Sequence, residues 1–159
     1  MVNISHICAI GIICPMLFGS GMQMKGFELI EHTADIGVVA AGGTLAEAFA
    51  NAACGLFSII TDISKVRELE SRIVKVKAAD IESLLFNWMN ELVYIFDVYH
   101  LLFSRFDVVE LTDGSLKATC YGEKYDPAVH ELKLGVKSAT FHMLEVDRAE
   151  KKVQVIFDI

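Results

Sequence analysis

Three short stretches of the 159-residue chain carry the side chains that could do chemistry. They are His32-Thr33-Ala34-Asp35, the segment from Gly135 to His142, and the ending Val155-Ile156-Phe157-Asp158-Ile159. The first offers an imidazole and a carboxylate, the second offers the amine of Lys137, and the third offers a carboxylate beside the α-carboxylate of the last residue. None of them has a spacing that decides its role alone.

Asp158 is the least ordinary of these residues, because it follows three apolar residues and lies next to the end of the chain. If its strand approaches Asp35, the two side chains and the α-carboxylate of Ile159 gather at least three anionic groups. Such a cluster needs a hard cation, Ca²⁺ or Mg²⁺, to offset the repulsion. The alternative is a solvated chain end, with Asp35 as a turn or cap residue and His32 as a hydrogen-bonded imidazole.

Two helices are predicted near these stretches. Thr44 and Glu47 form a capping box ahead of an apolar helical pattern that runs to Ile60. Asp80 caps a second, longer helix, in which apolar residues recur at helical spacing as far as Tyr99. The polar face of this second helix is typical of a solvated or partner-facing surface.

Strands are predicted before, between and after the helices, from alternating or β-branched runs bounded by turn residues. The runs are 27–31, 36–40, 72–77, 103–111, 116–121, 136–146 and 152–159. Asp113-Gly114 and the polar step 147–150 are typical of hairpins, which exclude an all-parallel sheet. We therefore expect an α+β fold, a two-layer sandwich of mostly antiparallel sheet with two main helices, in a single domain.

Composition limits the function. The apolar content of 53% and charged content of 22% are typical of an ordered globular protein. A formal net charge of −7 argues against direct binding of a nucleic-acid backbone, which requires clustered Lys and Arg. The four cysteines show no C-x-x-C pair, so no zinc site is expected. Cys54 and Cys120 lie in apolar patterns, and buried reduced thiols there would suit the cytoplasm.

Residues 1–23 contain an apolar run that resembles part of a signal peptide. No Lys or Arg precedes the run, Pro15 interrupts it, and it is too short for a transmembrane helix. Because Met24 immediately precedes the first ordered pattern, we expect 1–23 to be an upstream extension or a mis-assigned start, and 24–159 to be the domain. The alternative is a weak membrane or signal segment.

Several separated motifs resemble, in the same order, the signature of the archease family. They are Glu28-Leu29-Ile30-Glu31-His32-Thr33-Ala34-Asp35-Ile36-Gly37, Thr44-Leu45-x-Glu47-Ala48-Phe49, Thr61-Asp62, Leu84-Leu85-Phe86-Asn87-Trp88-Met89-Asn90-Glu91, Val136-Lys137-Ser138-Ala139-Thr140-Phe141-His142 and Ile156-Phe157-Asp158-Ile159. The resemblance covers residues 25–159, and several motifs in order are far less expected by chance than one.

The resemblance implies a cytoplasmic protein without catalysis of its own, which activates the GTP-dependent 3′-phosphate RNA ligase of tRNA splicing (RtcB type). It would assist guanylylation and repeated turnover, without binding nucleic acid directly and without a membrane. The resemblance also implies a divalent metal ion, Ca²⁺ as first choice, held by Asp35, Asp158 and the carboxylate of Ile159. Lys137 and His32 would be functional or partner-contacting positions.

Two other functional classes stay open at this stage. A carboxylate-bound metal could activate water, which would make the protein a metal-dependent phosphoester hydrolase. Against this, the sequence shows no dense two-metal ligand set and no nucleophile with an adjacent base. A chaperone-like module for other RNA-processing enzymes would differ from the ligase activator only in its clients. His142 and Glu91 lie in matching segments, but the resemblance assigns neither a role.

Overall fold

The computed structural model describes residues 26–31 and 34–159. All predicted helices and strands are present, with ends that shift by a few residues. In chain order the elements are β1 (Phe27–Glu31), β2 (Asp35–Ala41), α1 (Leu45–Ile60), the 3₁₀ turn η3 (Ile63–Lys65), β3 (Glu70–Lys77), α2 (Ile81–Tyr99), β4 (Leu101–Leu111), β5 (Ser115–Lys124), β6 (Ser138–Asp147) and β7 (Lys152–Asp158).

The helix ends are set by the residues that the sequence pointed to. The Thr44 side chain accepts a hydrogen bond from the Glu47 N–H at 3.1 Å, while the Glu47 carboxylate accepts one from the Gly43 N–H at 2.6 Å. At α2, Asp80 Oδ1 accepts from the Ser83 N–H at 2.7 Å. These bonds satisfy backbone donors that a helix start otherwise leaves unpaired.

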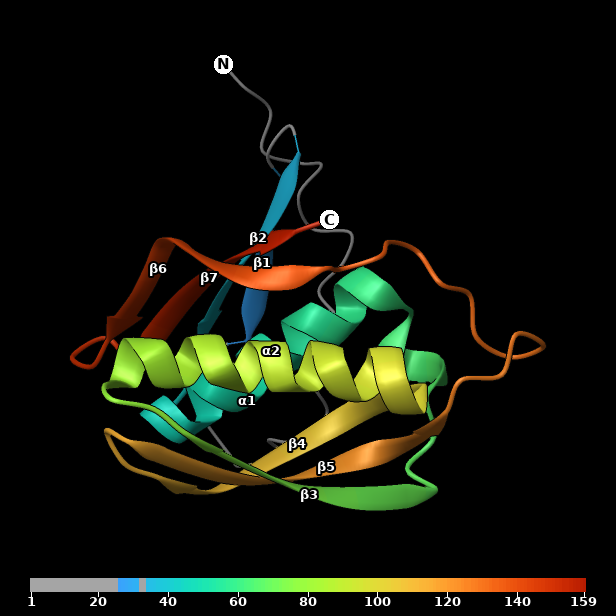
Figure 1. The fold of residues 1–159 in the computed structure, drawn as a ribbon, viewed down its shortest axis with the longest axis horizontal. Helices are drawn as coiled ribbons and strands as arrows, with labels where there is room; N and C mark the ends of the chain where they lie inside the picture. The colour runs from blue at the N-terminus through green and yellow to red at the C-terminus, as the bar shows by residue number, and fades with distance from the viewer. Residues whose placement is uncertain (1–25, 32–33) are drawn as a thin grey trace.

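The strands form two antiparallel sheets, one in the order β1-β2-β7-β6 and the other in the order β3-β5-β4. The helices lie between the two sheets (Figure 1). The predicted α+β class, with two main helices and mostly antiparallel sheet, is confirmed. The predicted two-layer arrangement is corrected to three layers, because the strands divide between two sheets on opposite sides of the helices.

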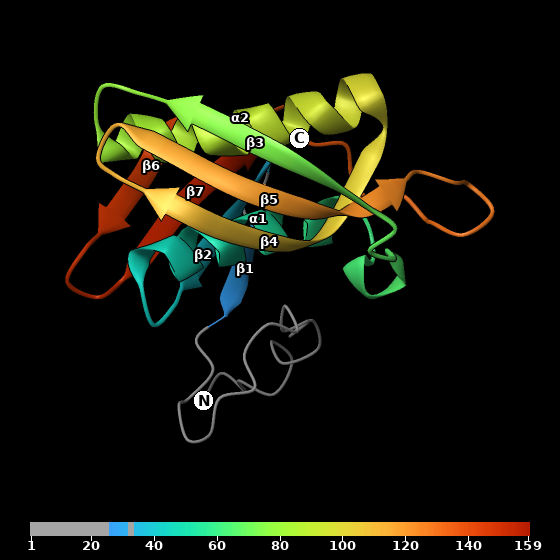
Figure 2. The same cartoon turned by 90° about the horizontal axis from the view of Figure 1, so that it is seen from below.

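The core fills the space between each sheet and the helices. α1 packs against β2 and β4, and α2 packs against β6 and β3. The fully buried Trp88 donates its indole N–H to the Phe49 carbonyl at 3.1 Å, which links the two helices. Seen from below, the β3-β5-β4 sheet lies in front of the helices, and no described element covers its outer face (Figure 2).

The predictions about residues 1–23 lie outside the described residues. Within the described part of the chain, no helix is long and apolar enough to cross a membrane. Cys120 is a buried free thiol, as expected. Cys54 is buried, as its apolar pattern predicted.

Candidate metal centre

The two aspartates singled out by the sequence face each other. Asp35 begins β2, Asp158 ends β7, and they are directly opposite in the antiparallel register. Directly opposite residues project to the same face of a sheet, with Cβ atoms about 4.5–5.5 Å apart. Asp35 is half-buried and Asp158 is exposed, so water can reach the pair.

The alternation of β7 decides which face carries the pair. Val155 and Phe157 are fully buried, and the period of two places Ile156 and Asp158 on the opposite face. Ile156 pairs with Gly37, where an added Cβ would come within 2.8 Å of Ile156 Cδ1. The isoleucine side chain therefore fills the space over the glycine, and the aspartate pair has an apolar neighbour on its own face.

β6 brings Lys137 to the same corner of the molecule. Ser138, the first residue of β6, pairs with Asp158, and the Lys137 N–H donates to the Asp158 carbonyl at 2.8 Å. The Lys137 side chain is exposed and forms no ion pair with any residue that the structure describes. Its ammonium is therefore available to an anion brought by a partner.

Two predicted positions remain, Ile159 and His32. Ile159 follows β7 directly, and its half-buried side chain packs against the hydrophobic core, which anchors the end of the chain next to Asp158. His32 lies outside the described residues.

The donor set suits a hard cation with open coordination positions. Like charges directly opposite one another in a sheet are destabilising, and neither aspartate has a salt bridge to a described residue. Among the described side chains, no three His, Cys, Asp or Glu residues gather to hold a metal. A metal at this corner would therefore take the two aspartates, with other oxygens from the chain end, water or a partner.

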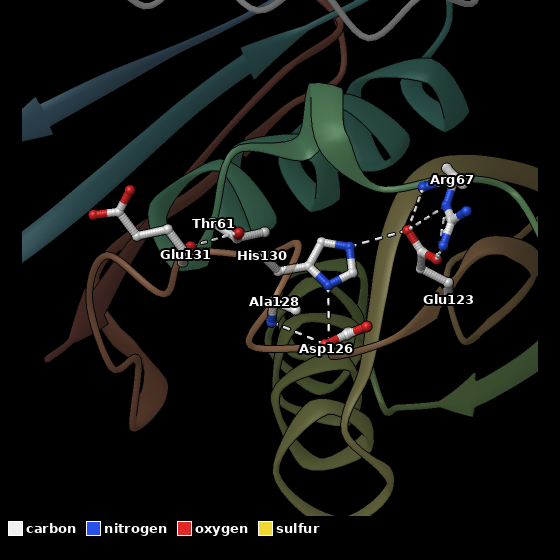
Figure 3. A network of polar contacts seen from close by, with 7 residues as sticks. All are labelled: Thr61, Arg67, Glu123, Asp126, Ala128, His130 and Glu131. Carbon is white, nitrogen blue, oxygen red and sulfur yellow. Dashed lines mark hydrogen bonds and ion pairs between the residues drawn. The ribbon is translucent and has the colours of Figure 1, made fainter.

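A second polar cluster, which the sequence did not reveal, surrounds the buried Glu123 (Figure 3). Its carboxylate accepts hydrogen bonds from the Arg67 backbone N–H at 2.9 Å and from the Arg67 guanidinium, the shortest at 2.8 Å. His130, which is 3% exposed, lies 3.0 Å from the same carboxylate through Nε2. His130 Nδ1 accepts from the Asp126 N–H at 3.0 Å, so Nε2 carries the proton and donates to Glu123.

This cluster holds two segments of the chain together. Hydrogen bonds from Arg67 are the main cause that lowers the pKa of Glu123 to about 2, and such a carboxylate is a poor general base at neutral pH. The cluster joins the segment after α1 to the segment after β5, which the hydrogen bond from Thr61 Oγ1 to the Glu131 carbonyl also links. Glu123, Asp126 and His130 lie close together in the sequence, but Arg67 is 56 residues from Glu123. No local sequence signal could have paired Arg67 with this carboxylate.

The polar face of α2 also differs from a purely solvated surface. Asn90 Oδ1 accepts from the buried Ala139 N–H of β6 at 2.8 Å, and Asn87 donates to the Lys77 carbonyl at 2.8 Å. Glu91 lines a depression between α2 and β3 with both asparagines. Asn90 thus supports the strand that begins at the metal corner, a role that the sequence did not indicate.

Comparison with known proteins places these features in a family. The Archease protein family (MTH1598/TM1083) matches residues 27–159. Protein archease from Methanosarcina acetivorans is 40% identical over 143 residues, which cover 86% of this chain and 98% of that protein. Protein archease from Sulfurisphaera tokodaii is 42% identical over 125 residues, which cover 78% of this chain and 90% of that protein.

Two solved structures share the fold. The solution structure of Methanobacterium thermoautotrophicum protein 1598 is 40% identical and superposes with a TM-score of 0.72, covering 86% of this chain and 100% of the other. The crystal structure of a Thermotoga maritima protein described as an archease, possible chaperone, is 20% identical with a TM-score of 0.56, covering 89% and 100%. At that identity the second likeness concerns the fold alone.

Proposed function

The chain belongs to the archease family, and from that premise we propose that it is a metal-binding activator of the GTP-dependent 3′-phosphate RNA ligase of tRNA splicing. It would promote guanylylation and repeated turnover of the ligase without catalysis of its own. The observation that carries the proposal is the register pair Asp35–Asp158, which brings the carboxylates at the start of β2 and the end of β7 to one accessible corner.

The metal in this proposal is a divalent ion, with Ca²⁺ as first choice. Ca²⁺ prefers carboxylate and water oxygens in flexible geometry, and two facing aspartates with open positions suit it. Taking Ile159 as the last residue of the protein, its α-carboxylate would be the third anionic donor. A hard cation there would offset the repulsion between the carboxylates and keep positions for a partner's groups.

Lys137 has a separate part in the proposal. Its backbone is tied to Asp158, while its side chain is exposed without a described ion-pair partner. The ammonium of a lysine whose backbone is fixed at this corner can pair with a phosphate or with a carboxylate of the ligase. His32 stays a predicted functional position.

The partner is proposed to be the ligase rather than RNA. The net charge of −7 disfavours a phosphate backbone and suits a protein with basic surface. A chaperone-like role for other RNA enzymes is the wider form of the same proposal, and the Thermotoga maritima protein is described as a possible chaperone. A cytoplasmic location belongs to the proposal and is testable by cell fractionation.

The test is ligase turnover with and without this protein, with a ligase from the same organism. Substoichiometric wild-type protein should stimulate ligation, and Asp35→Asn or Asp158→Asn should reduce the stimulation. Asp113→Asn is the matched control, because Asp113 is an exposed turn carboxylate whose one ion-pair partner among the described residues is the exposed Arg148. Absence of stimulation by the wild type would overturn the proposal, and conversion of RNA or nucleotide by the protein alone would favour the hydrolase.

A further inference from the structure

β6 carries an apolar bulge at the edge of its sheet. Thr140 pairs with Ile156, yet the next paired residue of β6 is Glu145, opposite Gln154. An advance of five residues along β6 therefore corresponds to an advance of two residues along β7. The β6 residues in between are not paired with β7. β6 is the outer strand of its sheet and lies alongside α2 (Figure 1).

The bulge presents two large apolar side chains to water. Phe141 is 57% exposed and Met143 is 53% exposed. The Phe141 ring stacks on Phe86 of α2, with centroids 4.0 Å apart and planes inclined by 12°. Met143 has a φ of 55°, a backbone angle that residues other than glycine seldom adopt. Its carbonyl accepts a hydrogen bond from the side-chain amide of Gln154 at 3.0 Å. We call Phe86, Phe141 and Met143 the bulge surface.

Protection of an edge strand does not explain these side chains. Bulges do blunt edges against pairing, but edges are protected with charged residues, proline or twist rather than exposed Phe and Met. Bulges also re-aim side chains beside functional sites. Aromatic residues and Met are enriched in protein interfaces, and here the ring is already held in place, which lowers the entropic cost of docking.

We propose that the bulge surface is where the RNA ligase docks, a step that rests on the proposed function. Acidic side chains flank the apolar centre: Glu82 lies one helical turn before Phe86, and Glu145 ends the bulge. A protein that binds RNA must present Lys and Arg, so its surface complements an acidic rim. The surface of the ligase that fits the bulge surface is an apolar recess bordered by basic side chains.

The place of the bulge surface along β6 also supports docking of the ligase. The strand begins at Ser138, opposite Asp158 of the metal corner, and reaches Phe141 three residues later. At about 3.3 Å per residue, the two features lie roughly 10 Å apart along the strand, within one protein interface. A second copy of this chain fits less well, because the bulge interrupts the backbone ladder that strand-to-strand pairing would use.

The experiment uses the full chain and purified ligase, with Phe141→Ala and Met143→Gly as variants. Glycine adopts the φ of Met143 without strain, so the second variant removes the side chain and keeps the bulge. Ile73→Ala is the matched control, since Ile73 is 60% exposed on the outer face of the other sheet. Binding is measured by calorimetric titration, and ligation rate is measured against activator concentration.

Each bulge variant should weaken ligase binding about tenfold or more, which is a typical loss for an interface hot spot. The concentration for half-maximal stimulation should rise equally, with the maximal rate retained, whereas the control should stay within about twofold of wild type. Unchanged binding in both variants would overturn the docking surface while the proposed function stands. Wild-type protein that neither binds nor stimulates would overturn both. A wild-type dimer that the variants convert to monomer, without change in ligase binding, would assign the surface to a second copy.

Discussion

At the residue scale, the facing carboxylates Asp35 and Asp158 should control divalent-cation binding. Asp35→Asn or Asp158→Asn removes one anionic ligand and should weaken Ca²⁺ binding by at least about tenfold, judged from losses typical of disturbed metal sites. The metal-free variants should be as stable as wild type or gain up to about 1 kcal/mol, because a like-charge pair is relieved. Calorimetric titration and thermal unfolding in chelator measure the two effects.

The control for this pair is Asp113→Asn, which should leave both quantities near wild type. Equal Ca²⁺ affinity in wild type and both variants would remove the two aspartates from the metal site. A large loss of stability without metal would show that the carboxylates make structural contacts rather than repel.

Glu123 should contribute a pH-dependent part of the stability. Hydrogen bonds from Arg67 hold its pKa at about 2 in the folded protein, below the ordinary value of 4.5. A carboxyl with a lowered folded-state pKa stabilises the fold above its unfolded-state pKa, and this stabilisation is lost as the pH falls from about 4.5 towards 2.

The variant Glu123→Gln tests this. At pH 7 it should lower the free energy of unfolding by about 1–3 kcal/mol, since the Arg67 and His130 donors lose their charged acceptor. The difference from wild type should shrink on acidification below pH 4.5. Denaturant titrations at pH 7 and pH 3 measure it, with the exposed Glu110→Gln as control. A difference that stays constant with pH would contradict the role of the Glu123 charge.

At the element scale, β6 depends on α2 as well as on β7. Asn90→Ala would leave the buried Ala139 N–H without its acceptor, which costs about 1–3 kcal/mol. We expect faster hydrogen exchange at the Ala139 amide, and a loss of Ca²⁺ affinity smaller than that of Asp35→Asn.

Asn87→Ala is the matched control, because it removes an amide of the same helix whose bond to the Lys77 carbonyl is exposed. It should leave Ala139 exchange unchanged. Equal exchange at Ala139 in both variants would show that pairing with β7 alone holds the start of β6.

At the scale of the whole molecule, the end of the chain should matter more than its beginning. With Ile159 as the last residue, a C-terminal extension of a few residues replaces the α-carboxylate with a neutral amide. It should weaken Ca²⁺ binding and ligase stimulation, while an N-terminal tag of equal length should do little. Ca²⁺ affinity should also fall on acidification, because protons compete for the carboxylates. An extended protein that binds Ca²⁺ and stimulates as well as the native one would refute the role of the α-carboxylate.

The sequence by itself determined the local features of this protein. Caps at Thr44 and Asp80, apolar periodicity and the Asp113-Gly114 turn predicted both helices and most strand positions, because each signal acts within a few residues. The ordered motifs also indicated the family, which the comparisons show.

Only the tertiary structure decided how these parts meet. The pairing of Asp35 with Asp158, the division of the strands between two sheets, and the contact of Asn90 with Ala139 each join residues far apart in the chain. The bulge in β6 depends on its register with β7. Register and layering follow from the simultaneous burial of every apolar face, so no single segment contains enough information to specify them.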